Sequence, residues 1–320
     1  MFTASHQASA WAARSLNPWS AVMVKQTSAP ARRIPSRFVT QDWIDKRIAS
    51  GVGQGVREQY QPWIKVRSVA SLGSSHIVPG VKIRRAHHLL SKAEFHFHLI
   101  LEHDPAVIDI REQYPLLPQA ETYSIACSLG YRPVFYPRTK VPHVFTTDFL
   151  ITSEVKGGGE KVVARTVKYR SEIKELSPKK RARLLEKLAI EKLYWSRRGI
   201  DWKLVLYEHL SPVHIQNLVK LRSYALVSAA LATEKNFQKV TEFIDESRPT
   251  EISLRLLLTK LSKALFIDYK EVKSLFFHML WQRRLLMDFE NQEIDLARPL
   301  NVLTPQSFVI NICDERRDHA

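Results

Sequence analysis

Apolar and β-branched residues are concentrated in two neighbouring stretches near the middle of the chain. Residues 144–155 read VFTTDFLITSEV and residues 162–169 read VVARTVKY, and both stretches are rich in Val, Ile, Phe and Thr. Between them lie Gly157, Gly158 and Gly159. Because β-branched and aromatic residues favour strands and glycines favour turns, the pattern predicts a β-hairpin.

The arms of this hairpin carry one acidic and one basic residue on a mainly apolar face. If the turn is symmetric about Gly158, paired residue numbers sum to 316, which places Asp148 opposite Lys168 and Leu150 opposite Thr166. Directly opposed side chains share a face of the sheet, with Cβ atoms roughly 5 Å apart. Taken alone, the pair fits either a cross-strand salt bridge or part of a catalytic site.

A helical pattern occupies residues 89–102, LLSKAEFHFHLILE. Phe97 and Leu101 recur at helical spacing on the same side as Glu94. Ser91 precedes Glu94 by three residues, the spacing of a capping box at a helix start. A glutamate on the apolar side of a helix must be desolvated unless a cation meets it. The pattern therefore favours a structural salt bridge or a metal ligand at Glu94.

The elements around the hairpin predict two domains. Before it, a strand and a helix closed by Gly130 give an α/β layer. After it comes a basic amphipathic helix that begins at Ser177–Pro178 and stops at Gly199, then a strand and several helical stretches. Residues 285–296 alternate like a small hairpin, and helices followed by such a wing are typical of a winged helix-turn-helix. The predicted divisions are a basic arm (1–41), an α/β domain (42–172), a mostly α domain (173–300) and a tail (301–320).

Composition adds a polyanionic partner to this picture. The 320 residues carry a formal charge of +16 with a pI of about 9.8, an excess that favours nucleic acid. The chain has no apolar run of 18 residues, so we expect no membrane span. Only two cysteines are present, which argues against a zinc site or disulfide framework and suits a reducing cytoplasm.

The first 41 residues contain no Asp or Glu and are rich in Ala, Ser, Pro and Arg. Three interpretations fit this composition: a disordered arm that contacts DNA phosphates, a transit peptide, or an upstream-shifted start with Met23 as the true beginning.

Four runs in order resemble the TnsA family, the endonuclease subunits of heteromeric transposases. The resemblance is densest over residues 60–170 and continues more weakly through the helical second half. The runs are RRAHHLLSKAEFHFHLILEHDPAVIDIREQYPL (84–116), ETYSIACSLGYRP (121–133), HVFTTDFLIT (143–152) and ARTVKY (164–169).

This resemblance implies a restriction-endonuclease-like fold of the PD-(D/E)xK type that cleaves DNA with Mg²⁺, for which Mn²⁺ substitutes. It implies that Glu94 and Asp148 are acidic metal ligands and Lys168 is the catalytic lysine. It also implies that the backbone carbonyl of Val167 is a further metal ligand, as the carbonyl at this position is in this fold class. The motif usually has Glu or Gln two residues before the lysine, whereas this chain has Thr166, a shorter and weaker ligand.

The resemblance also implies partners and a location. The expected substrate is DNA at the 5′ ends of a transposon, and the expected partners are a TnsB-like transposase and a TnsC-like AAA+ regulator in the bacterial cytoplasm, associated with the nucleoid. The family suggests a nuclease that is silent without its partners. There are two alternatives. One is a restriction or repair nuclease of the same fold, and the other is a non-enzymatic DNA-binding factor that has lost the catalytic motif at Thr166.

Two further groups of residues are candidates for the site and for DNA. Glu112 and Gln113, in the IREQYPL run, fit either a polar shell around the site or a hydrogen-bonding pair at a strand end. Clusters of basic residues suit phosphate contacts, and each alone also fits a solvated face. These clusters are Lys179, Lys180, Arg181 and Arg183, then Arg197 and Arg198.

Overall fold

The computed structural model describes residues 39–68, 74–247 and 251–305. The expected basic arm therefore lies outside the described residues except for its last three, as does most of the expected tail. In the described part, no helix is long and apolar enough to cross a membrane.

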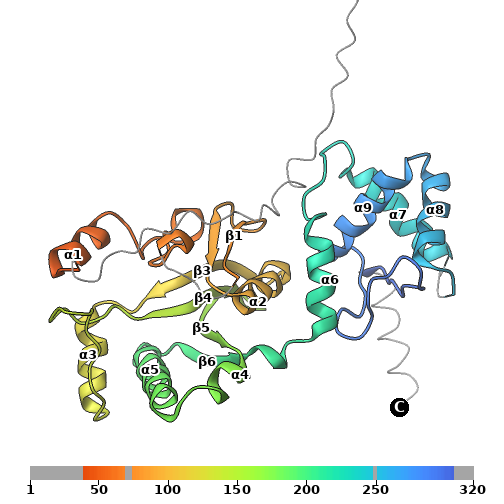
Figure 1. Ribbon diagram of the computed structural model, residues 1–320. Helices are drawn as coiled ribbons and strands as arrows, with labels where there is room; N and C mark the ends of the chain where they lie inside the picture. The colour runs from red at the N-terminus through yellow and green to blue at the C-terminus, as the bar shows by residue number, and fades with distance from the viewer. Residues whose placement is uncertain (1–38, 69–73, 248–250, 306–320) are drawn as a thin grey trace, which may run out of the picture.

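A four-stranded sheet forms the centre of the first domain, in the order β3-β4-β5-β6 (Figure 1). β4 runs antiparallel to both β3 and β5, and β6 runs parallel to β5. A separate antiparallel pair, β1 and β2, lies outside this sheet. The strands are β1 (His76–Pro79), β2 (Ala86–Leu89), β3 (Val107–Pro115), β4 (Thr146–Glu154), β5 (Glu160–Lys168) and β6 (Asp201–Leu206).

Helices lie before, between and after these strands along the chain. The first five are α1 (Gln41–Ala49), α2 (Lys92–His103), α3 (Gln119–Ser128), α4 (Arg170–Lys174) and α5 (Pro178–Ser196). The second half contributes α6 (Pro212–Arg222), α7 (Glu234–Ser247), α8 (Leu254–Leu265) and α9 (Tyr269–Trp281). Short 3-10 turns occupy Arg57–Gln59, Val66–Ser68 and Tyr207–His209.

The sheet is the middle of three layers, with α2 on one face and α3 and α5 on the other (Figure 1). Because successive residues of a strand point to opposite faces, β4 contributes to both cores. Phe149 packs with Phe97 on the α2 side, and Leu150 packs with Trp195 on the α5 side. Burial on both faces explains why residues 146–152 of β4 are all buried, although only Phe149, Leu150 and Ile151 among them are apolar.

The predicted hairpin is confirmed, but its register differs from the symmetric one by two residues. Phe149 pairs with Arg165 and Leu150 with Ala164, so paired numbers sum to 314 and the turn centres on Gly157. Thr166 is therefore not opposite Leu150, and the structure corrects this expectation. A shift of two residues leaves every side chain on its predicted face, since the period of a strand is two.

The sheet extends past residue 172, where the sequence placed the end of the first domain. β6 pairs with β5 from Val163–Asp201 to Lys168–Leu206, and α5 is the crossover that joins these two parallel strands. The basic helix predicted to open the second domain thus covers the sheet instead. The second core begins with α6.

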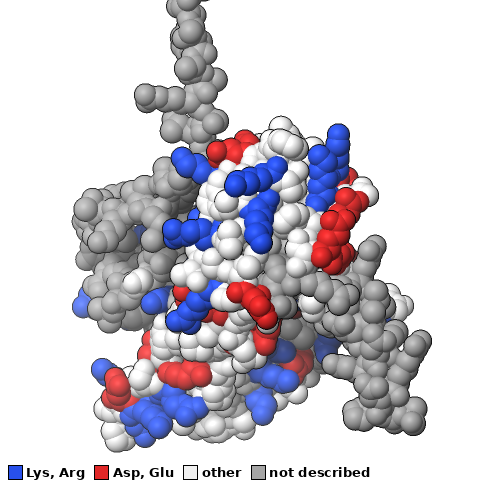
Figure 2. Space-filling model, turned by 90° about the vertical axis from the view of Figure 1, so that its right-hand side faces the viewer, with Lys and Arg blue, Asp and Glu red and all other residues white. Residues whose placement is uncertain are grey.

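Helices α6 to α9 share the second core, and no regular strand occurs in residues 251–305. The small hairpin expected over 285–296 is absent from this described stretch, which contains only isolated bridges. Ser253 bridges Pro299, and Leu286 bridges Leu303. On the face formed by this half of the molecule, Lys and Arg are interspersed with Asp and Glu (Figure 2).

Helix α2 joins the two halves of the protein. Phe97 and Leu101 pack in the core under the sheet, whereas Leu99 belongs to the core of α6–α9. Glu102, near the end of α2, accepts a hydrogen bond from Arg222 Nε of α6 at 3.1 Å. One helix therefore carries contacts from both cores.

Candidate active site

Asp148 and Lys168 meet where β4 and β5 stop pairing. The last pair of this ladder is Phe149–Arg165, and beyond it the Asp148 side chain reaches across to β5. Asp148 Oδ2 accepts hydrogen bonds from the backbone N–H of Val167 at 2.8 Å and from Lys168 Nζ at 2.9 Å. The sequence expectation that these two charged residues lie side by side is thus met, although they are not directly opposed.

The Lys168 ammonium also donates to the Val167 carbonyl oxygen at 2.9 Å. Burial by itself lowers the pKa of this lysine, but the negative charges of Asp148 and Glu94 outweigh burial and raise it above its usual value. The side chain is therefore a cation at neutral pH. It donates hydrogen bonds to two oxygen atoms, of Asp148 and Val167, that the family resemblance assigns to a metal.

Glu94 approaches this pair from the first turn of α2. Ser91 caps the helix by accepting the Glu94 N–H, and the Glu94 carboxylate in turn accepts Leu90 N–H at 2.9 Å and Ser91 Oγ at 3.1 Å. Burial, followed by repulsion from Asp148, raises the pKa of Glu94 to about 7. The effect of Asp148 shows that helix and strand bring the two carboxyl groups into one site.

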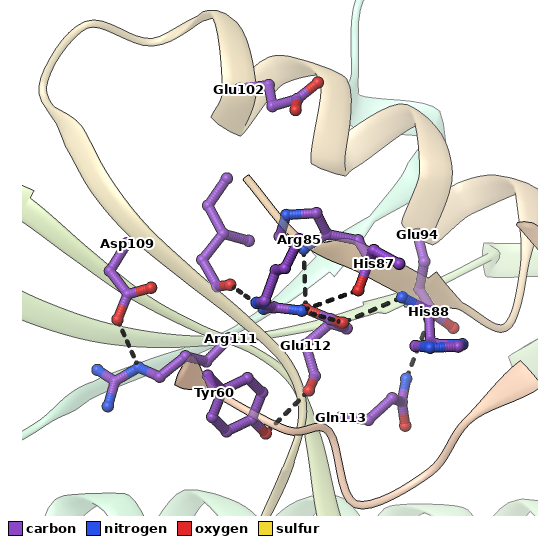
Figure 3. A network of polar contacts seen from close by, with 12 residues as sticks. Tyr60, Arg85, His87, His88, Glu94, Glu102, Asp109, Arg111, Glu112 and Gln113 are labelled. Carbon is purple, nitrogen blue, oxygen red and sulfur yellow. Dashed lines mark hydrogen bonds and ion pairs between the residues drawn. The ribbon is translucent and has the colours of Figure 1, made fainter. Parts of the chain in front are cut away.

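Gln113 holds Glu94 from the neighbouring strand. Its Nε2 donates to Glu94 Oε2 at 3.0 Å, and Figure 3 shows the two side chains facing each other. Gln113 is buried and has a φ of 49°, the left-handed region that non-glycine residues seldom adopt. This backbone kink in β3 is what lets the residue after Glu112 turn towards α2.

Glu112 anchors a separate buried network beside the site (Figure 3). Its carboxylate accepts both terminal nitrogens of Arg85, at 2.8 and 2.6 Å, and the backbone N–H of His88, and it contacts His87 Nδ1 at 3.0 Å. Although burial raises a carboxyl pKa, the hydrogen bonds from Arg85 and His87 outweigh it and lower the pKa of Glu112. The network fastens β2 to β3 and so supports the strand that carries Gln113.

Glu191 of α5 is a third acidic side chain at this place, and the sequence reasoning missed it. Thr166 Oγ1 donates to Glu191 Oε1 at 2.5 Å and accepts from Trp202 Nε1 at 3.2 Å. Burial raises the pKa of Glu191, the cation of Lys187 opposes this, and the charge of Asp148 adds to it. Its signal in the sequence was a glutamate on the apolar side of a helix. The same kind of signal identified Glu94.

Comparison with known proteins covers the strands that carry Asp148 and Lys168, whereas Glu94 lies outside the matched range. Residues 104–206 match the family model described as "TnsA-like endonuclease N terminal". The chain is 38% identical over 181 residues to the transposon Tn7 transposition protein TnsA of Escherichia coli. Residues 104–206 are therefore similar to the N-terminal endonuclease domain of the TnsA family. The aligned region covers 56% of this chain and 62% of the length of the Escherichia coli protein.

The donor atoms of the candidate site suit a hard divalent cation. Two carboxylates and a carbonyl oxygen gather around Lys168, and Mg²⁺ is commonly held by one or two carboxylates together with substrate phosphate and water. Asp148 Oδ1 accepts no hydrogen bond from the described residues. No cluster of three or more His, Cys, Asp or Glu side chains placed to hold a metal occurs in the described ranges.

The predicted basic residues of the TnsA-like domain divide into paired and unpaired groups. Arg183 pairs with Glu186 and Arg198 with Glu121, while Arg181 donates to the carbonyls of residues 173, 174 and 176. Within the described part of the chain, no ion pair involves Lys179, Lys180 or Arg197. These last three are the members of the set that are free to meet phosphate.

Proposed function

We propose that this protein is the Mg²⁺-dependent endonuclease subunit of a heteromeric transposase and hydrolyses phosphodiester bonds at the 5′ ends of its transposon. The convergence of Glu94, Asp148 and Lys168 at the open end of the β4–β5 ladder carries this proposal. The TnsA-like endonuclease domain and the similarity to a Tn7 transposition protein supply the substrate and the process.

Glu94, Asp148 and the Val167 carbonyl would hold the metal. When bound, Mg²⁺ neutralises phosphate charge and lowers the pKa of a coordinated water. A cation would also reduce the repulsion between Glu94 and Asp148, which Lys168 offsets in the structure. Gln113 keeps the Glu94 carboxylate aimed at the site through the 3.0 Å hydrogen bond.

Lys168 acts as a donor and a positive charge in this scheme. In the metal-free protein the charges of Asp148 and Glu94 raise its pKa and keep the ammonium protonated at neutral pH. The ammonium is placed to donate to a phosphate oxygen or to orient the attacking water. This role stabilises charge that develops in the transition state.

Glu191 supplies the carboxylate that Thr166 lacks. The family motif has Glu or Gln at the position of Thr166, and here the threonine hydroxyl is hydrogen-bonded to a buried glutamate from α5. The influence of Asp148 on the pKa of Glu191, and of Glu191 on that of Lys168, places the third acid within electrostatic reach of the site. Thr166 thus connects Glu191 of α5 to strand β5 through a hydrogen bond.

The second half of the chain suits a winged-helix domain that contacts partners. Helices α7, α8 and α9 follow each other, and the bridges Ser253–Pro299 and Leu286–Leu303 join the segments that flank α8 and α9. We infer a winged helix from this order of helices, with the isolated bridges in place of the expected small hairpin. We assign to it the contact with a TnsC-like regulator, and to the complex a TnsB-like transposase that processes the 3′ ends.

A reconstituted cleavage reaction tests the proposal. Full-length protein, the partner transposase and donor DNA are incubated with Mg²⁺ or Mn²⁺, and 5′-end nicks are mapped for wild type, Asp148→Asn and Lys168→Gln. Both variants should lose nicking by at least about a hundredfold, because each removes a charge that acts on the scissile phosphate. Calorimetry with Mg²⁺ alone should show weaker binding to Asp148→Asn.

Glu154→Gln is the matched control, since Glu154 lies at the far end of the same strand and is exposed. It should nick as wild type does. Equal nicking by wild type and Asp148→Asn would refute the catalytic assignment. Nicking of DNA that lacks transposon ends, without any partner, would favour a restriction or repair nuclease instead.

A further inference from the structure

The segment that leads into the first catalytic strand has an unusual charge pattern. No Asp or Glu occurs between Glu121 and Asp148, although the protein as a whole contains 32 acidic residues. The same interval contains Arg132, Arg138 and Lys140, which are exposed and form no ion pair with the described residues. Three positive charges therefore stand on this segment without local neutralisation.

The segment folds into a small hairpin, residues 134–143, called here the basic hairpin. His143 N–H donates to the Val134 carbonyl at 2.9 Å, and Tyr136 N–H donates to the Val141 carbonyl at 3.0 Å. Thr139 closes the tip through its N–H and its hydroxyl, both of which donate to the Tyr136 carbonyl. Arg138 and Lys140 flank Thr139 and so project at the tip.

The basic hairpin is held in place from its inner side. Tyr136 and Val141 pack against the cluster that contains Ile44 of α1 and Trp63. The Tyr136 and His143 rings lie 4.6 Å apart. Such anchoring gives the basic tip a fixed position, which a charged loop without core contacts would lack.

An aromatic pair lies beside the charges. Phe135 of the basic hairpin and Tyr123 of α3 contact each other edge to face, with ring centroids 6.0 Å apart, and remain 40% and 39% exposed. Exposed aromatic rings next to unpaired cations form a surface that binds the sugar-phosphate backbone and the bases of nucleic acids.

The chain itself limits the distance from this surface to the catalytic carboxylate. Lys140 precedes Asp148 by eight residues, and an extended chain spans at most about 3.5 Å per residue, so the tip lies within about 30 Å of Asp148. That distance corresponds to roughly nine base pairs of DNA at about 3.4 Å per base pair. Lys187 of α5 lies over the Phe145 ring at 6.0 Å, which extends the positive charge from the hairpin towards the site.

We propose that the basic hairpin, together with Tyr123 and Phe135, binds the backbone of the DNA duplex next to the scissile phosphate. The proposal rests on the proposed nuclease function, because that function places DNA at Asp148. Arg132, Arg138 and Lys140 contact phosphates, and the aromatic pair packs on the sugar edge. The hairpin thereby fixes the distance between the bound duplex and the site that cuts it.

Charge favours DNA over a protein on this surface. A protein partner would need a wholly acidic patch to match three unpaired cations, whereas every phosphate of DNA supplies the charge. The face of the second domain, by contrast, mixes both signs (Figure 2), as expected for a surface that meets proteins or solvent. Continuity of the hairpin with β4 links it to the strand that carries Asp148.

The test measures DNA affinity as a function of salt for full-length protein without metal. The probe is a duplex of about 40 base pairs of arbitrary sequence, because phosphate contacts do not depend on sequence. The triple variant Arg132→Gln/Arg138→Gln/Lys140→Gln is compared with Lys156→Gln/Lys235→Gln/Lys239→Gln. The control removes the same charge from exposed lysines elsewhere, which form no ion pairs with the described residues.

Each phosphate contact contributes about 0.9 to the slope of log affinity against log salt, so the hairpin variant should lose about 2 to 3 of slope. The control variant should keep the wild-type slope. In a second measurement, 5-iodouracil placed within about ten nucleotides of the mapped cut should cross-link to Phe135 or Tyr123.

Equal salt slopes for the two triple variants would overturn the proposal. So would a hairpin variant that keeps the wild-type DNA slope but no longer binds the partner transposase, because the hairpin would then be a protein contact. The salt measurement needs no cleavage. A wild type that never nicks DNA would therefore refute the nuclease function without deciding the role of the hairpin.

Discussion

Glu94→Gln tests the electrostatics of the site by a route that does not depend on catalysis. The glutamine preserves the packing and the local hydrogen bonds, because its carbonyl can accept Leu90 N–H and Gln113 Nε2 while its amide donates to Ser91 Oγ. Only the ionisable group is lost. In metal-free buffer we expect the variant to be more stable than wild type at pH 8 and inactive in cleavage.

The magnitude follows from the pKa of Glu94, which burial and Asp148 raise from 4.5 to about 7. A carboxyl group whose pKa is higher in the folded state stabilises the fold while it is protonated, and this contribution is lost as the pH rises through the folded value. At 1.36 kcal/mol per pKa unit, the wild type should lose up to about 3 kcal/mol between pH 4.5 and 7. The difference between the two proteins should open over that window and stay constant above it.

Urea denaturation in EDTA, followed by tryptophan fluorescence at pH 5, 6, 7 and 8, measures this difference. Glu112→Gln is the control, since it makes the same change at another buried carboxyl whose pKa is lowered by Arg85 and His87. It should destabilise the protein at pH 7 by roughly 3–5 kcal/mol, because a buried guanidinium loses its partner. Parallel stability curves for wild type and Glu94→Gln from pH 5 to 8 would refute the reasoning.

Three further substitutions have expected outcomes. Thr166→Gln should lower stability by about 1–3 kcal/mol in thermal melts and fail to improve Mg²⁺-supported nicking, because the larger side chain displaces Glu191. Arg222→Met should cost roughly 3–5 kcal/mol in urea melts by leaving Glu102 buried and unpaired, and the added change Glu102→Gln should recover part of the loss. Phe266→Gly should raise stability by about 1 kcal/mol, because Phe266 has a φ of 55° and is 95% exposed, so that strain is relieved and no packing is lost. A lower melting temperature for this last variant would show that the ring is packed in solution.

Local patterns were sufficient to predict the elements that carry the site. The β-branched and aromatic content of two stretches around three glycines predicted the hairpin, and an assumed symmetric turn put Asp148 and Lys168 on one face. The Ser91–Glu94 spacing predicted the cap that starts α2. These features depend on residues close in sequence, where periodicity and capping chemistry act directly. How these helices and strands pack together was expected from the family resemblance, because the resemblance implies a fold and periodicity alone does not.

Features that depend on distant pairing were not predictable in this way. Gly157, Gly158 and Gly159 all have φ between 92° and 100°, so composition alone does not fix which glycine centres the turn. The parallel pairing of β6 with β5 joins segments separated by α5, and without it the basic helix looks like the start of a new domain. Glu191 was missed for the same reason, since its partner Thr166 is 25 residues away.

The position of α2 in both cores gives the second domain a physical route to the catalytic centre. Glu94 lies in the first turn of this helix, Leu99 in the middle packs with the core of α6–α9, and Glu102 near its end is bonded to Arg222. A 12-residue helix is rigid over this length, so a displacement of α6 shifts Glu94 relative to Asp148. In the proposed nuclease such a shift would change the placement of a metal ligand. The shared helix would then connect the second domain to the site without any contact between a partner and Glu94 or Asp148.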